Sequence, residues 1–273
     1  MGSFRNKLRF YLIDCKTPIG KFIDVFIIFL NLLIITTFVI ETYPISEAAR
    51  AVIWKIEVIT VIIFIVEYIA RLYAAEKLKV QFYNTYQMID LIAIIPTLLI
   101  IILPVFGLSL NLRFLNLIRI VRVLRVFRFL RFMQDPDFFF GRVTFFLLQV
   151  ARLALTILII FFISSGFFYF VEHSVNPNVS NFGDAFYFTV VTITTVGFGD
   201  IIPLTEWGHW VTVLMIISGI IFIPYHVSQI SRAWRKTQHI NVTCKKCGLK
   251  YHDRDASHCK SCGSVIYQEY ENT

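Results

Sequence analysis

Four cysteines near the C-terminus stand in two pairs whose spacing suits a metal ion. Each pair has the form Cys-x-x-Cys-Gly, and eleven residues separate Cys244–Cys247 from Cys259–Cys262. Paired thiolates at this spacing are typical of tetrahedral zinc sites, with iron in a rubredoxin-like site as the alternative. Four thiolates leave no open coordination position, so we expect a structural zinc ion. We expect His252 and His258 at the surface and not among the ligands.

A second set of side chains carries permanent positive charge inside an apolar stretch. Five of its members recur at every third position, and a sixth continues the register: Arg119, Arg122, Arg125, Arg128 and Arg131, with Arg113. A guanidinium stays protonated, so a membrane field acts on each of them. An α-helix arranges such charges as a spiral, and a 3₁₀-helix arranges them as a straight row. We expect these arginines to sense voltage.

Uncompensated arginines are costly in hydrocarbon, so other apolar segments must supply carboxylates opposite them. Four acidic residues meet this need: Asp24, Glu57, Glu67 and Asp90. Phe64 lies three residues before Glu67, and Arg71 lies four residues after it. We expect the acids to pair with the arginine row.

A third set of residues suits ion conduction through its backbone. The run Thr195-Val196-Gly197-Phe198-Gly199-Asp200 follows a short apolar segment. Glycine adopts unusual φ values without a Cβ penalty, which lets successive carbonyls point the same way. Carbonyls of four chains around one axis can replace the hydration shell of a potassium ion. We expect the Thr195 hydroxyl to complete the innermost ion site.

The run from Thr195 to Asp200 resembles the signature of potassium channels. The flanking Asp184-Ala185-Phe186 and Val190-Val191-Thr192 resemble its voltage-gated branch. This resemblance implies a homotetramer with potassium ions in the filter. Phe64, Glu67 and Asp90 resemble the charge-transfer centre of voltage sensors, which implies an aromatic plug between outer and inner water and acids that hold the passing arginine.

Two positions depart from the family pattern. Phe198 stands where a tyrosine is typical, and Tyr187-Phe188 replaces a pair of tryptophans. Neither Phe198 nor Phe188 has a polar hydrogen, so any contact between them is packing alone. Tyr187 retains a hydroxyl that can donate to Asp200. We expect potassium selectivity to survive, with altered filter stability and inactivation.

These sets must be positioned by membrane-spanning elements, which need roughly 20 apolar residues each. Six segments qualify: Phe22–Ile40, Val52–Leu72, Met88–Leu103, Arg113–Phe132, Leu153–Val171 and Trp210–Ile230. The shorter Phe182–Thr194 predicts a re-entrant helix. Lys and Arg are absent from residues 172–208, so we expect this loop outside and both termini in the cytosol. The expected fold is an all-α membrane protein with a four-helix voltage sensor, a two-helix pore with a re-entrant loop, and a small cytosolic zinc ribbon.

The expected organisation follows from these segments. It comprises a cytosolic segment (1–21), a voltage sensor (22–133), a linker (134–149) with a helix at Phe138–Gln149, a pore domain (150–235) and a zinc ribbon (239–273). In the sixth segment Gly219 and Pro224 permit bending, while close packing is the alternative role for Gly219. Ile223 and Tyr225 are candidates for the gate. The family's Pro-x-Pro motif is absent, since Ile223-Pro224-Tyr225 stands there.

The composition narrows the function classes. The chain of 273 residues is 57% hydrophobic and 16% charged, which is typical of a membrane protein. Most of its net charge of +8 comes from the six arginines in one apolar stretch, so we expect no nucleic-acid binding. We expect a voltage-gated, potassium-selective channel of the plasma membrane, with lipid and further copies of the chain as partners. The sequence identifies no cytosolic partner of the zinc ribbon.

Three alternatives remain at this point. One is a weakly voltage-dependent or hyperpolarisation-activated cation channel with the same architecture. Another is a membrane-anchored zinc scaffold with a vestigial pore. The third is a membrane redox enzyme, but the sequence has no haem, flavin or catalytic pattern, so we expect no enzyme.

Overall fold

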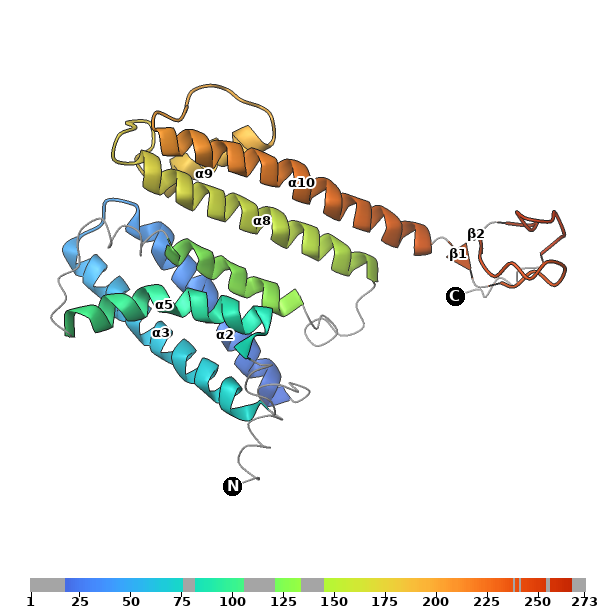
Figure 1. Cartoon of the computed structure of the whole chain (residues 1–273), viewed down its shortest axis with the longest axis horizontal. Helices are drawn as coiled ribbons and strands as arrows, with labels where there is room; N and C mark the ends of the chain where they lie inside the picture. The colour runs from blue at the N-terminus through green and yellow to red at the C-terminus, as the bar shows by residue number, and fades with distance from the viewer. Residues whose placement is uncertain are drawn as a thin grey trace.

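The structure, a computed structural model, describes residues 18–75, 82–105, 121–133, 145–237, 239–240, 242–253 and 256–266. Over these ranges the chain is mostly helical. Figure 1 shows a bundle of α2, α3, α5 and the arginine-bearing helix beside a second group of α8, α9 and α10. A small module with two short strands follows the end of α10.

The first bundle corresponds to the expected sensor region. Its elements are α2 (Pro18–Glu41), α3 (Glu47–Ala74), α5 (Thr85–Val105) and the 3₁₀-helix η1 (Arg122–Met133). Helix α3 begins after Ser46, whose side chain accepts a hydrogen bond from the Ala49 amide and caps the helix. The bundle core joins three helices through six buried side chains: Ile27, Leu30, Ile34, Val61, Phe64 and Ile94.

The second group contains α8 (Phe145–Glu172), α9 (Phe182–Ile193) and α10 (Glu206–Thr237). The short helix α9 begins with a capping box between Asn181 and Asp184. It packs on α8 through Phe188 and Phe168, whose stacked ring centroids are 4.1 Å apart. Residues 145–149, which the sequence placed in the linker helix, begin α8 instead, and residues 134–144 lie outside the described ranges.

Three described helices are long and apolar enough to cross a membrane: Phe22–Glu41, Gln149–Glu172 and Glu206–Arg232. Helices α3 and α5 stand beside α2 in the same bundle (Figure 1). Helix α3 carries the ionisable residues Glu57, Glu67 and Arg71, all of which are buried. These charged side chains therefore face the neighbouring helices. The opposite face of α3 is apolar, with Ile59, Ile62 and Val66 exposed.

A buried carboxylate joins the C-terminal end of α8 to the N-terminal end of α10. Glu172 is fully buried, and its two oxygens accept hydrogen bonds from the Leu204 amide (2.9 Å), the Thr205 amide (2.9 Å) and hydroxyl (2.7 Å), and the Asn176 amide group (2.9 Å). A Cβ on Gly208 would collide with this carboxylate. The Glu172 hydrogen bonds therefore fix the loop that connects the filter to α10.

We expect the substitution Glu172→Gln to lower the free energy of unfolding by about 2 kcal/mol, because hydrogen bonds to a charged acceptor are lost in a buried site. Thermal unfolding of the purified protein in detergent measures this effect. The matched control is Glu206→Gln, since Glu206 is exposed at the same end of α10. Equal unfolding temperatures for the two variants would contradict the structural role of Glu172.

Candidate functional site

Arg128 lies at the centre of the first bundle and is 2% exposed. Its Nε donates to Asp90 Oδ1 on α5 at 2.8 Å, and its Nη2 lies 3.6 Å from Glu67 Oε2 on α3. Its guanidinium carbon lies 3.7 Å from the centre of the Phe64 ring, a cation–π contact. The structure thus brings Phe64, Glu67 and Asp90 together around one arginine of the row.

Arg125 occupies a separate site one step along the row. Its Nη1 lies 3.0 Å from Glu57 Oε1, and its Nε donates to the Ala93 carbonyl at 3.2 Å. Its Nη2 donates to the Thr97 hydroxyl, which in turn donates to Glu57 Oε1 at 3.0 Å. Two successive arginines therefore hold two successive carboxylate sites.

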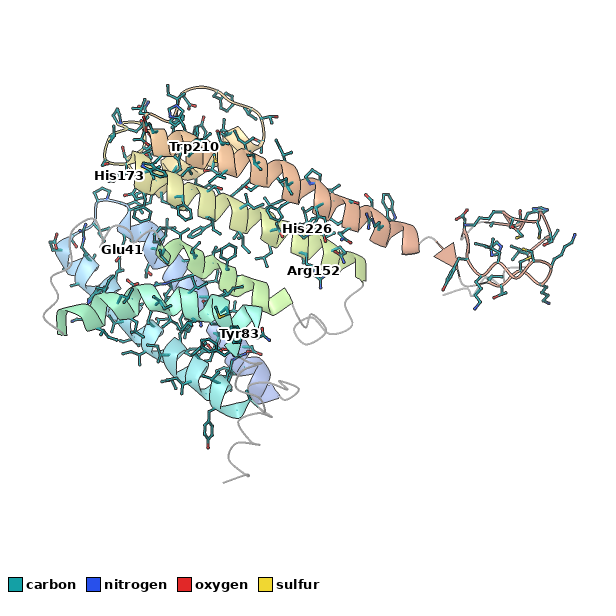
Figure 2. The ribbon with its side chains drawn as sticks, viewed as in Figure 1. Glu41, Tyr83, Arg152, His173, Trp210 and His226 are labelled. Carbon is teal, nitrogen blue, oxygen red and sulfur yellow. The ribbon has the colours of Figure 1, made fainter. Side chains whose placement is uncertain are left out.

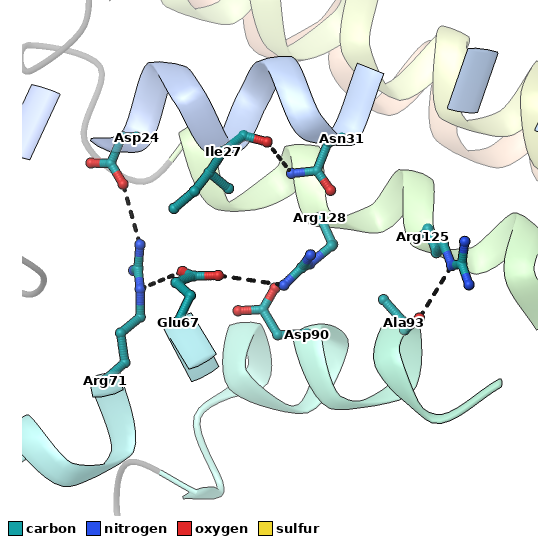
Figure 3. Close-up of polar contacts among 9 residues, drawn as sticks. All are labelled: Asp24, Ile27, Asn31, Glu67, Arg71, Asp90, Ala93, Arg125 and Arg128. Atoms are coloured by element: carbon teal, nitrogen blue, oxygen red, sulfur yellow. Dashed lines mark hydrogen bonds and ion pairs between the residues drawn. The ribbon is translucent and has the colours of Figure 1, made fainter. Parts of the chain in front are cut away.

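A third ionic group closes the end of the bundle near the start of α2. Arg71 Nε lies 2.5 Å from Glu67 Oε1, and Arg71 Nη2 donates to Asp24 Oδ1 at 3.2 Å. Figure 3 shows the resulting chain of charges from Asp24 through Arg71 and Glu67 to Arg128 and Asp90. Neighbouring charges in this chain have opposite signs, so each buried charge has a partner. Burying any of them without a partner would be very costly.

The backbone around these arginines is a 3₁₀-helix from Arg122 to Met133. Three residues per turn place side chains three positions apart in a straight row, so the straight arrangement holds here and not the α-helical spiral. Arg113 and Arg119 lie outside the described residues, as do the side chains of Arg122 and Arg131.

Sequence reasoning missed two residues of α5 in this site. Thr97 and Gln87 lie on the same face of α5 as Asp90, and their exposed fractions are 0% and 1%. The Gln87 amide has no hydrogen-bond partner among the described residues. The helical spacing of positions 87, 90 and 97 could have marked this polar face, but threonine and glutamine in an apolar helix carry no strong signal on their own.

The filter run has the backbone that its glycines predict. Thr195, Gly197 and Gly199 have φ values of 62°, 58° and 77°, while Val196 and Phe198 are not in the positive-φ region. This alternation turns successive carbonyls to one side of the strand. Thr195 adopts positive φ without the freedom of glycine, and such strain persists where the surrounding structure holds it.

Asp200 is held by hydrogen bonds at the C-terminal end of the filter run. The Tyr187 hydroxyl donates to Asp200 Oδ2 at 2.8 Å, as the sequence predicted, and the Asn178 side chain donates to the Asp200 carbonyl at 3.3 Å. Phe198 is 70% exposed in the single chain and Val196 is 53% exposed. Helix α9 therefore supports one side of the filter run through Tyr187, while the side chains of Val196 and Phe198 are exposed in the single chain.

Helix α10 continues through Pro224 without a break. A Cβ on Gly219 would lie 2.9 Å from Ile193 Cγ2, so Gly219 permits close packing of α10 on the end of α9. Ile223 is half-buried and Tyr225 is 58% exposed. The next residue of α10, His226, has its Nε2 3.1 Å from the Thr156 hydroxyl of α8. Figure 2 shows His226 on α10 and Arg152 on the adjacent α8.

The four ribbon cysteines converge on one point. Their sulfurs all lie within 4.8 Å of one another, and both Cys244–Cys262 and Cys247–Cys259 are separated by 3.6 Å. Four sulfurs about 2.3 Å from a central zinc ion lie about 3.8 Å apart, so the cluster fits the ion. Gly248 and Gly263 follow the two pairs with φ of 77° and 68°, which closes two equivalent turns.

The electrostatics of the thiols also suit a cation. The Ser264 hydroxyl and nearby backbone amides lower the pKa of Cys244 to about 5. The Leu249 amide lowers the pKa of Cys247, but hydrogen bonds with the neighbouring thiols outweigh it and raise that pKa to about 11. Clustered thiols resist full ionisation without a positive ion at their centre.

The small sheet joins this cluster to α10. Strands β1 (His239–Ile240) and β2 (His252–Asp253) pair antiparallel, with Ile240 opposite His252. His252 is fully buried and its Nδ1 donates to the Val242 carbonyl at 2.9 Å. The expectation of a surface position for His252 was wrong, because pairing with β1 covers it, whereas His258 is exposed as expected.

Comparison with known proteins identifies the family of this chain. Residues 20–232 match the ion transport protein family. The chain is 34% identical over 205 residues to the hyperpolarization-activated voltage-gated potassium channel of Methanocaldococcus jannaschii, covering 74% of this chain and 91% of that protein. It is 29% identical over 206 residues to the potassium voltage-gated channel protein Shal of Drosophila melanogaster, covering 72% of this chain and 35% of that protein. The chain therefore belongs to the ion transport protein family and, within it, to the voltage-gated potassium channels.

Proposed function

We propose that the chain is one subunit of a homotetrameric, voltage-gated and potassium-selective channel of the plasma membrane, with both termini in the cytosol. One observation carries the voltage-gated part. Arg125 and Arg128, successive members of one charge row, occupy two successive carboxylate sites in the same bundle. A row that slides by one step exchanges one arginine for the next without leaving a buried charge unpaired.

The energy available from such a movement is sufficient to open a pore. One elementary charge that crosses the membrane field gains about 2.3 kcal/mol per 100 mV. Three or four arginines in each of four subunits therefore supply tens of kcal/mol. We assign the sensing role to the six arginines of the row, with Phe64 as the plug and Glu57, Glu67 and Asp90 as their partners.

Conduction is assigned to the residues from Thr195 to Asp200. The alternating φ values of this run support a queue of carbonyl oxygens, which bind dehydrated potassium ions once four chains surround one axis. Exposed apolar side chains of α10, such as Ile220 (68%) and Leu214 (64%), support burial against further copies. We place the gate in α10 at Ile223 and Tyr225, which flank Pro224, and we assign to Gly219 and Pro224 the positions at which the helix can bend on gating.

The topology we propose has six spans, with α9 and the filter as a re-entrant loop. The sensor covers residues 22–133, the linker 134–144, the pore 145–235 starting with α8, and the zinc ribbon 239–273. The ribbon holds one structural zinc ion through Cys244, Cys247, Cys259 and Cys262, and it begins directly below α10.

A second candidate function is opening on hyperpolarisation. The relative from Methanocaldococcus jannaschii is named for this behaviour and covers most of the chain. The same sensor movement can open or close a pore, depending on how α10 is coupled to it. Reversal potentials in mixed sodium and potassium, followed by voltage steps of both signs, test the proposed function and separate the two polarities. Sodium permeability equal to that of potassium would refute the selective pore.

We expect Gly199→Ala to lower the ratio of potassium to sodium permeability by at least about tenfold. Gly199 has a φ of 77°, and an L-residue with a Cβ in this region costs about 1–2 kcal/mol. In the proposed tetramer this cost arises in each of the four subunits around the filter axis. Reversal potentials of the reconstituted variant measure the ratio. Ile202→Val, in the exposed loop beyond the filter, is the control and should conduct selectively. Unchanged selectivity in Gly199→Ala would contradict the assigned filter.

We expect Arg128→Gln to reduce the steepness of the conductance–voltage relation by roughly a quarter to a third, because one of three or four moving charges is lost. Current families recorded in planar bilayers give this slope. Arg50→Gln removes an exposed arginine at the start of α3 and should leave the slope unchanged. An equal slope in wild type and Arg128→Gln would remove Arg128 from the sensing charge.

We expect the purified chain to contain one zinc ion per subunit and Cys259→Ser to lose most of it, since Cys259 is a buried member of the thiolate set. Metal analysis by mass spectrometry measures the content. Cys15→Ser, which alters the one cysteine outside the ribbon, is the matched control. Iron in place of zinc, or full zinc content in Cys259→Ser, would contradict the assignment.

A further inference from the structure

The sensor and the pore of one chain share a single hydrophobic core. Val123 and Val126 of η1 are 1% and 0% exposed, and they cluster with Ile159 and Phe162 of α8. Gly166 of α8 makes this approach possible, because a Cβ there would lie 2.6 Å from Val123 Cγ2. Contacts this close require matched surfaces, as inside a folded domain.

Helix α2 makes a second contact with the pore region of the same chain. The Phe38 ring lies 5.8 Å from Phe162, 6.0 Å from Phe170 and 5.9 Å from Phe182 between centroids. The Thr42 hydroxyl accepts a hydrogen bond from the Phe182 amide at 3.0 Å. This bond satisfies one of the N–H groups that the first turn of α9 leaves without an intrahelical partner.

The connection between the two regions is short. Helix η1 ends at Met133 and α8 already begins at Phe145, so eleven residues join them. A short connection keeps a sensor at high effective concentration near its own pore, because the entropy of loop closure is small. A neighbouring pore gains no such advantage.

We propose that each sensor in the tetramer packs against the pore helices of its own chain, and that sensors are not exchanged between neighbouring subunits. The proposal rests on the homotetramer of the proposed function. It assigns the face of α8 that carries Ile159, Phe162 and Gly166 to η1 of the same chain. Exposed α10 remains available to the other copies.

This arrangement defines how force passes from sensor to gate. A displacement of η1 acts directly on α8 through Val123 and Val126, and α8 packs along α10 (Figure 1). Movement of one sensor therefore bears first on the gate helix of its own subunit.

A disulfide between η1 and α8 tests the proposal. The Cβ of a residue at 166 lies 3.3 Å from Val123 Cβ, close to the roughly 3.5–4.5 Å that a disulfide needs. The double variant Val123→Cys, Gly166→Cys is made in a Cys15→Ser background, saturated with zinc and oxidised with diamide. We expect the two added thiols to disappear by mass spectrometry while the chain runs as a monomer on a denaturing, non-reducing gel.

The control pairs Val123→Cys with Leu158→Cys, because Leu158 is 53% exposed on α8 and does not belong to the cluster around Val123. It should keep its two added thiols. A ladder of covalent dimers, trimers and tetramers that appears only in the Val123, Gly166 variant would show exchanged sensors and overturn the proposal. Folded tetramers that form neither product would overturn it as well.

A second variant keeps the test independent of the folding of the first. The photo-crosslinker p-benzoylphenylalanine replaces Phe38, which faces three rings of the pore region. Illumination should join α2 to peptides of α8 or α9 without an increase in chain mass, and covalent dimers would contradict the proposal. Native mass spectrometry and potassium flux are recorded on the same samples. A tetramer that conducts but forms intersubunit products refutes only this inference, whereas loss of both tetramer and flux refutes the proposed function.

Discussion

The structure of the first bundle depends on one constraint, which is that a guanidinium buried among apolar helices must meet a carboxylate. Arg128 meets this constraint through Asp90 and Glu67, and Arg125 meets it through Glu57. The acids occupy fixed positions on α3 and α5, whereas the arginines share one 3₁₀-helix. A straight row can advance past fixed partners with each charge taking the place of the one before it. In the proposed sensing movement, such buried ion pairs would favour a few discrete positions of η1 over those between them.

The pore depends on a different constraint, which acts on the backbone. The filter needs alternating backbone conformations. These are held by α9, by the Tyr187–Asp200 hydrogen bond, and by the buried Glu172 carboxylate that binds the loop before α10. These supports come from residues of a single chain, and the exposed side chains of the filter run and of α10 are the surface that the proposed tetramer would bury. The shared core between η1 and α8 joins the two constraints, because it places the charge row directly on a helix of the pore.

Much of this organisation could be predicted from the sequence, since the decisive features are chemical types at regular spacing. Alternating glycines and paired cysteines each indicate a local geometry, the three-residue repeat of arginine indicates a charge row, and α9 lies where the sequence predicted a short helix. Thr97 and His252 were missed because their roles depend on partners distant in the sequence. The start of α8 at Phe145 was also missed, because apolar residues continue from the linker into the span without a helix-breaking residue. The choice between a spiral and a straight row depended on backbone hydrogen bonding, which side-chain spacing does not determine.

The central claim is that membrane voltage moves the arginine row and that this movement controls a pore. The most direct measurement is the limiting slope of open probability against voltage for single wild-type channels in a planar bilayer. The proposed sensors require several elementary charges to move for each channel that opens, with either polarity of opening. An open probability that is the same at every voltage would contradict the account.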